Sequence, residues 1–200
     1  MAALAIGKNM LSNQMSKITA PSSNIKINWE DFNFPPLLKL FHFSLEGLPE
    51  DYKKISRMLL ISFIIACVNI LLNIINQIAQ TAAGFEGIRV FYAFLNGLIL
   101  IPAAMFTFYR GYRGLCDNKD LLFIYKILQG CLIIVWILFS ILDTQATTGF
   151  VRVGKLLDSG FGFQGVLGII ESVLYLSNAF FSALIAWKIH TFIPQAQTKV

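Results

Sequence analysis

The chain has 200 residues, of which 56% are hydrophobic and only 14% carry a charge. About 25% of the residues in an average soluble domain are charged, so this composition argues against an ordinary water-soluble domain and for a chain that lies in lipid. The formal net charge is +5, and the basic residues that produce it are unevenly distributed along the chain.

Four apolar stretches hold most of the hydrophobic residues: 58–79, 90–109, 121–142 and 165–187. Each has about twenty residues, enough for a helix to cross a hydrocarbon core of about 30 Å. The stretches are apolar on every side, whereas strands of a membrane β-barrel would show shorter segments of alternating polarity. We therefore predict an all-α membrane protein whose four transmembrane helices form two hairpins.

The basic residues favour one orientation of these spans. Twelve Lys or Arg precede the first span, lie between the second and third, or follow the fourth, whereas only Arg89, Arg152 and Lys155 lie in the other two connections. Connections on the cytosolic side of a membrane carry an excess of positive charge. An even number of spans places both ends of the chain on one side, so we predict that both termini are cytosolic.

The chain before the first span divides into two parts. Residues 1–27 are typical of a polar cytosolic tail, and residues 28–57 of an amphipathic segment in which Pro35 and Pro36 interrupt any continuous helix. This segment is expected on the membrane surface or against the cytosolic end of the bundle. After Pro49, two acids followed by three bases predict a helix that begins here and continues into the membrane. Residues 58–192 then form the four-helix domain, and residues 193–200 a short cytosolic tail.

Polar side chains also lie inside the predicted spans. Asn69, Asn73 and Asn76 lie at i, i+4 and i+7 and share one face of the first helix. Such amides either fix packing through interhelical hydrogen bonds or line a polar path, and we favour packing because no second helix offers a matching stripe. Glu171 lies about 9 Å along the fourth helix from Gly165, a shallow position. Its carboxyl needs a hydrogen bond from one of the three asparagines, or a pairing with Arg89, unless it is protonated.

Other motifs give little support for chemistry. No nucleophile, base and orienting group occur together, and the two histidines have no ligand-spaced partners, so we expect no catalytic residue, metal site or cofactor. The stretch "GFGFQG", residues 160–165, matches a dinucleotide-binding pattern but follows no strand. Its glycines instead predict a tight turn, with Gly165 and Gly168 allowing close helix contact. Cys116, beside the membrane in a basic stretch, is a candidate for palmitoylation.

Several stretches resemble one known family. Residues 28–57 combine an Asn-Trp pair, a Pro-Pro-Leu, an aromatic run, a Leu-Pro and a basic approach to the first span, as at the start of the core of the secretory carrier membrane proteins (SCAMPs). The resemblance continues through "VNILLNII" in the first span, "IPAAMFTFYRGYRG" at the end of the second, and "WKIH" after the fourth. It covers about residues 28–192, in the same order and spacing around four spans.

The resemblance implies four spans with both termini cytosolic, residence in Golgi, endosomal and secretory vesicle membranes, and a role in vesicle trafficking rather than catalysis. In that family the connection between the second and third spans is linked to phosphoinositide binding. Tyr109 and Arg110 match its Cys-Trp-Tyr-Arg-Pro motif, Arg113 is offset from it, and Lys119 follows. These four residues are therefore candidates for binding lipid headgroups. The Asn-Pro-Phe repeats that recruit adaptors in many members are missing from this sequence, so recruitment by that route is not expected.

The sequence leaves three functional hypotheses. The first is a SCAMP-like, non-catalytic protein of secretory or endosomal vesicles that acts through membrane lipids and protein partners, with no nucleic-acid partner. The second is an accessory subunit of a large membrane complex, in which a neighbour would hold the polar tail of residues 1–27. The third, a small channel or transporter, would require the asparagine face and Glu171 to line one water-filled path.

Overall fold

Helices account for nearly all regular structure in the computed structural model, which describes residues 27–197. The helices are α2 (Glu50–Ala82), α3 (Ile88–Cys116), α4 (Leu121–Ile141), α5 (Phe150–Asp158) and α6 (Gly162–Gln197). Four of them, α2, α3, α4 and α6, are long and apolar enough to cross a membrane. The described residues contain isolated β-bridges but no strand. The prediction of an all-α membrane protein with four spans is thus confirmed.

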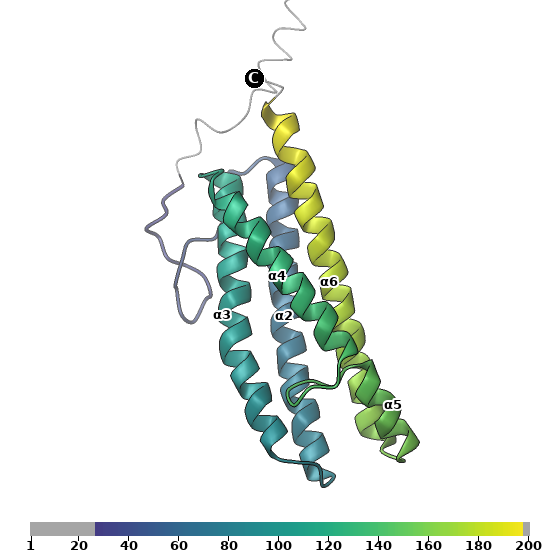
Figure 1. The fold of residues 1–200 in the computed structure, drawn as a ribbon. Helices are drawn as coiled ribbons and strands as arrows, with labels where there is room; N and C mark the ends of the chain where they lie inside the picture. Colours follow the sequence, from purple (N-terminus) through teal and green to yellow (C-terminus); the bar gives the residue numbers. More distant parts are fainter. Residues whose placement is uncertain (1–26, 198–200) are drawn as a thin grey trace, which may run out of the picture.

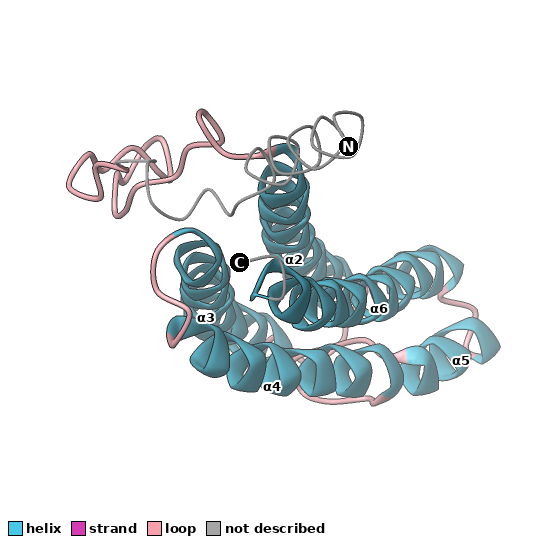
Figure 2. Ribbon diagram, turned by 90° about the horizontal axis from the view of Figure 1, so that it is seen from above, coloured by secondary structure: helices cyan, strands magenta, loops and turns pink. Residues whose placement is uncertain are grey.

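The four long helices form a ring in which α2 packs against α3 and α6, and α4 against α3 and α6 (Figures 1 and 2). The beginning of α2 and the end of α6 lie at the same end of the bundle, at the top of Figure 1. This end carries Lys54, Arg110, Arg113, Lys119 and Lys188, and we call it the basic end. The opposite end, with the α2–α3 turn and α5, is called the α5 end. The sequence predicts that the basic end is cytosolic.

Helix α3 extends well beyond the predicted second span, which we expected to end at residue 109. It continues to Cys116, so Tyr109, Arg110 and Arg113 lie on a helix and not in a loop. Small residues make this extension possible, because α4 packs directly on it. A Cβ atom on Gly111 would come within 2.8 Å of the Tyr125 ring, and one on Gly114 within 2.7 Å of Leu122.

Helix α5 was not predicted, and we expected only a long connection there. It is short and amphipathic, burying Val153 and Leu156 against the rest of the molecule. It lies along α6, where the two glycines predicted to allow close contact do so: a Cβ on Gly165 would come within 2.5 Å of Leu157, and one on Gly168 within 2.8 Å of Val153. Gly160, at φ +83°, makes the tight turn between α5 and α6.

Residues 27–49 run outside the ring beside α2 and α3 (Figure 2). Their aromatic side chains pack on α3: the rings of Phe41 and Tyr109 are 4.6 Å apart, and those of Phe43 and Tyr112 are 4.8 Å apart. The Tyr112 hydroxyl also donates a hydrogen bond to the carbonyl of Ser44 (2.8 Å). The sequence predicted that this segment lies either on the membrane surface or against the end of the bundle. Its aromatic face packs against the bundle.

The connection between α4 and α5 is folded tightly on itself. Residues 142–149, here called the α4–α5 loop, are closed by a hydrogen bond from the Gly149 N–H to the Leu142 carbonyl (3.2 Å) and by a bridge between Asp143 and Thr148. A Cβ on Gly149 would overlap the backbone of Ile141 and Leu142. The chain can close here because residue 149 has no side chain.

We predict that Gly149→Ala destabilises the protein by about 1 to 3 kcal/mol, the usual effect of forcing extra volume into a packed site. The Gly154→Ala variant is the matched control, because a Cβ there meets nothing within 4 Å and alanine favours a helix. Thermal unfolding of both variants in the same detergent gives the comparison. Equal melting temperatures for the two variants would contradict the tight closure of the loop.

Candidate functional site

The predicted asparagine face of α2 lies inside the bundle and is longer than expected. Asn69, Asn73 and Asn76 are fully or almost fully buried, and Gln77 and Gln80 extend the same polar face toward the α5 end. Helix α6 carries a matching stripe, contrary to our expectation that no second helix has one: Glu171, Ser172, Asn178 and Ser182 are buried as well. Several of these groups bond across the two neighbouring helices, and others bond to the connection between α4 and α5.

Glu171 is the centre of this polar region. Its side chain is 0% exposed, and it lies nine residues into α6, about 13 Å along the helix. It is therefore farther from the start of its helix than the 9 Å expected from the sequence, because α6 begins before Gly165. Asn73 donates to one carboxylate oxygen (2.8 Å) and Asn76 to the other (2.6 Å). The backbone N–H of Thr148 donates to the first oxygen (3.1 Å).

These contacts decide between the partners that the sequence offered for Glu171. Two of the three asparagines bind it, whereas no hydrogen bond or ion pair joins it to Asn69 or Arg89 in the described part of the chain. All three groups that contact the carboxyl are donors. Such a set of N–H donors matches a carboxylate, whose two oxygens only accept hydrogen bonds.

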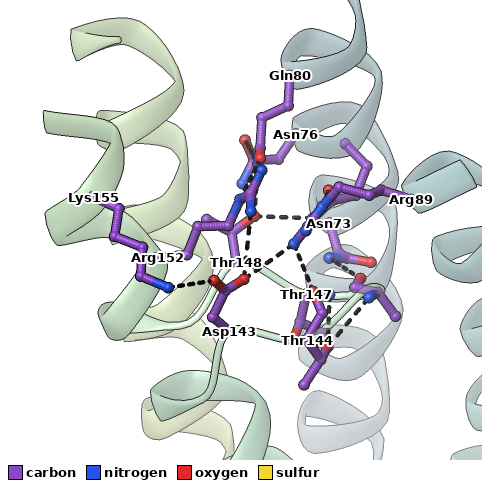
Figure 3. A network of polar contacts seen from close by, with 12 residues as sticks. Asn73, Asn76, Gln80, Arg89, Asp143, Thr144, Thr147, Thr148, Arg152 and Lys155 are labelled. Atoms are coloured by element: carbon purple, nitrogen blue, oxygen red, sulfur yellow. Dashed lines mark hydrogen bonds and ion pairs between the residues drawn. The ribbon is translucent and has the colours of Figure 1, made fainter. Parts of the chain in front are cut away.

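Thr148 connects the α4–α5 loop to both helices. Its hydroxyl oxygen accepts hydrogen bonds from Gln77 (2.9 Å) and Gln80 (2.7 Å) on α2, and its carbonyl accepts one from Ser172 on α6 (2.9 Å). Together with the bond from its N–H to Glu171, this satisfies every polar group of one loop residue inside the bundle. The loop therefore fills the space between α2 and α6 at the α5 end (Figure 3).

An ion-pair network covers the buried groups on the side of the α5 end (Figure 3). Asp143 pairs with Arg89 of α3 (3.2 Å), and with Arg152 (3.5 Å) and Lys155 (3.1 Å) of α5. Arg89 also donates to the Thr144 carbonyl and to Gln77 (3.2 Å). Partial burial opposes ionisation of Asp143, but hydrogen bonds from Lys155 and Arg89 and the nearby Arg152 charge outweigh it and lower the pKa of this carboxyl below its usual value. The network therefore stays ionised in mildly acidic surroundings.

Nearer the basic end, the polar stripes of α2 and α6 meet again. The hydroxyl of Ser62 donates to Asn178 (3.1 Å) and lies 2.9 Å from the hydroxyl of Ser182. Beside them is a cavity of about 20 Å³, whose polar lining also includes Gln129 of α4. This volume suits about one water molecule. At this level the polar axis thus has room for about one water molecule.

The headgroup candidates at the basic end lie on two structural elements. Tyr109, Arg110 and Arg113 are on the last turns of α3, and Lys119 is exposed in the turn to α4. The guanidinium of Arg113 pairs with Asp117 (3.2 Å) and lies over the Trp29 ring (5.3 Å). That of Arg110 lies over the Phe106 ring (4.6 Å). Headgroup binding by these residues stays a prediction.

Cys116, the palmitoylation candidate, is the last residue of α3. Its side chain is half-buried against an apolar cluster that includes Phe108 and Leu115. A thiol in this position would have to turn outward before it could be acylated. Palmitoylation of Cys116 therefore also stays a prediction.

The sequence reasoning missed several members of the buried network, and two of them had a visible signal. Gln80 lies four residues after Asn76 and eleven after Asn69, so it continues the helical spacing of the asparagines, and Gln77 adjoins it. Asp143, Thr148 and Arg152 had no comparable signal, because their roles depend on the α4–α5 loop folding back into the bundle. The part of the chain that the structure describes holds no group of three His, Cys, Asp or Glu able to bind a metal ion.

We predict that Asn76→Ala destabilises the protein by about 1.5 to 3 kcal/mol, because it removes a hydrogen bond to a buried charged group. Asn69→Ala is the matched control: Asn69 is equally buried on the same helix, but neither of its side-chain polar atoms has a hydrogen-bond partner within residues 27–197. Unfolding of both variants in detergent compares them. A loss for Asn69→Ala as large as that for Asn76→Ala would mean that the bond to Glu171 has no special weight.

Comparison with known proteins adds one finding. The model of the SCAMP family matches residues 31–196, a region that includes most of residues 27–49, the described helices except the last residue of α6, and the α4–α5 loop. Neither a search of curated proteins nor a search of solved structures found a match. With four helices able to span a membrane and a family match over most of its length, the chain is a multi-pass integral membrane protein and belongs to the SCAMP family.

Proposed function

We propose that the protein acts in vesicle trafficking and protein transport within Golgi, endosomal or secretory vesicle membranes, through contacts with lipids and other membrane proteins and not through catalysis. The observation that carries this proposal is the family match over residues 31–196, which extends through both helical hairpins. The buried polar contacts support it, because amides of α2 that bond to the Glu171 carboxylate of the neighbouring helix favour a structural role over a transport path.

The basic end supports a role at a membrane surface. Its basic side chains, of which Lys54, Lys119 and Lys188 are exposed, come from α2, α3, α6 and the α3–α4 turn. Each Lys or Arg near an anionic membrane surface contributes about 1 kcal/mol of attraction. A cytosolic position for this end, as the charge distribution predicts, would place these residues at the anionic leaflet.

The trafficking role predicts that the tagged protein, expressed at its natural level, migrates with Golgi or endosomal vesicles and that its removal slows the recycling of a surface receptor. Fractionation and a receptor-uptake assay measure these two effects. Purification in a mild detergent separates this role from that of an accessory subunit. A stoichiometric large complex in another membrane, with recycling unchanged, would contradict the proposal and favour the subunit.

A second prediction concerns the headgroup candidates. If Arg110 and Arg113 bind phosphoinositides, replacing both with Gln lowers the number of phosphatidylinositol bisphosphate molecules that remain bound to the purified protein in native mass spectrometry. Lys54→Gln with Lys188→Gln is the control, because it removes the same charge from exposed residues at the same end, where α2 meets α6. Equal loss in the two double variants would show that only net charge matters. The arginines would then act merely as charges that set the topology.

A further inference from the structure

We propose that residues 34–41 form a finger that inserts into one leaflet of the membrane, the leaflet at the basic end, beside α3. The finger is the closed loop between Phe34 and Phe41, which are joined by a pair of backbone hydrogen bonds (2.9 and 3.0 Å). It would be a membrane-embedded element additional to the four spans. Its place, its surface chemistry and its backbone hydrogen bonds each support this assignment.

The contacts of the finger show that it points toward the middle of the bundle. At its base, Trp29 packs on Tyr112, and Phe43 packs on both Tyr112 (4.8 Å) and Phe108 (5.3 Å). Phe34 and Phe41, farther along the two limbs, pack on Phe108, one helical turn deeper along α3. Both limbs thus run in the same direction, and the tip lies beyond the level of Phe108. Figure 1 shows this loop running down alongside α3 from the basic end.

The position of Phe108 along α3 indicates how far the finger reaches toward the middle of the bundle. Phe108 lies eight residues before the end of α3 at Cys116, about 12 Å along the helix axis. Phe63 of α2, which stacks on Phe108 with ring centroids 5.7 Å apart, is thirteen residues into its own helix. Phe63 and Phe108 both lie within the predicted spans 58–79 and 90–109, so the finger begins beside the predicted membrane-spanning part of both helices and its tip extends farther in.

The surface of the tip suits lipid. Leu37 is 97% exposed, Leu38 67% and Leu40 50%. These adjacent leucines have no protein to cover them within residues 27–197, and such an exposed apolar group marks a site for lipid or a protein partner. The acidic residues of the segment, Glu30, Asp31 and Glu46, all lie outside the finger. The single charge of the tip is Lys39, whose long side chain can reach back to the headgroups.

The backbone N–H groups of the tip suit lipid as well, whereas the carbonyls of residues 36–40 accept no backbone hydrogen bond among the residues described. Irregular backbone is rarely found in hydrocarbon, because its unpaired N–H groups have no water to bond. Here Pro35 and Pro36 have no N–H, and the N–H groups of residues 38–41 all donate to the carbonyls of Phe34 or Pro35, at 2.8 to 3.1 Å. Only Leu37 lacks a backbone acceptor among the tip residues. Lys39 adopts φ 46°, which allows this closure.

The position of the finger favours lipid over a protein partner as the cover of its exposed leucines. At this level α3 also exposes apolar side chains outward, including Phe106 at 44%, and a membrane-spanning bundle presents such side chains to lipid. The finger continues that outward apolar surface. Because the finger adds volume to one leaflet only, it should favour membranes that are convex on the side of the basic end. Binding of other interfacial apolar segments is sensitive to curvature in the same way.

An environment-sensitive NBD fluorophore at position 37 tests the proposal. The probe is attached to a Leu37→Cys variant in which Cys67, Cys116 and Cys131 are replaced, and the protein is reconstituted in vesicles. Leu98→Cys, on an exposed apolar position within α3, serves as the lipid control, and Glu46→Cys, in an exposed turn, as the water control. Labelling an exposed position leaves the fold intact, which the circular dichroism of each variant checks.

We expect a blue-shifted emission at position 37 and quenching by nitroxide lipids labelled near the headgroup, with iodide in the buffer leaving it unchanged. Emission and iodide quenching like those at position 46 would overturn the proposal. Protection from both quenchers would overturn it too, because it would show that a second copy or another protein covers the leucines.

The curvature preference has its own test. In membrane tubes pulled from giant vesicles, with the basic end outward, the unaltered protein should be enriched over Leu37→Ser with Leu38→Ser. Leu98→Ala with Ile99→Ala is the control, since these residues are also exposed but lie on a helix that crosses both leaflets. Equal enrichment of all three proteins would contradict a curvature preference caused by the finger.

Discussion

The structure depends on how one buried carboxylate is satisfied. Glu171 has no access to solvent, and a charged group inside a membrane-spanning bundle is costly unless protein groups bond to it. Two amides of α2 and one backbone N–H of the α4–α5 loop supply those bonds. Because the donors come from both hairpins, Glu171 links them. Because one donor is backbone, the loop must fold back into the bundle.

The two ends of the bundle differ as a result. At the α5 end, the α4–α5 loop and the Asp143 ion pairs cover the polar interior, so this end is tied together by many short contacts. At the basic end, aromatic packing replaces the polar network, and residues 27–49 lie outside the ring on α2 and α3. The polar groups of the α5 end thus bond mainly within the protein, whereas the basic end is rich in basic, aromatic and apolar side chains. This difference is what we expect of a protein that acts at one membrane surface.

The sequence predicted the parts of the fold that depend on local pattern. Apolar length was enough for the four spans, and the acids and bases after Pro49 were enough for the start of α2. The spacing of the three asparagines placed them on one buried face. It did not show which of them bonds to Glu171, because that depends on the depth and rotation of α6 against α2.

Helix α5 and the role of Thr148 could not be predicted, since nine residues of mixed polarity become a helix here only through packing on α6. The last turns of α3 were not predicted, because a run of basic residues is typical of a loop. The helix continues here because Gly111 and Gly114 allow α4 to pack on it.

Hydrogen exchange at the α4–α5 loop tests the central claim most directly. In lipid nanodiscs, a peptide covering residues 142–149 should exchange as slowly as the buried turns of α2 and α6, because the Thr148 N–H is held by Glu171 (3.1 Å) and the Gly149 N–H by Leu142 (3.2 Å). Exchange should become fast when Glu171 is replaced by Leu, which removes the acceptor. Rapid exchange in the unaltered protein, at the rate of an exposed connection, would contradict the account.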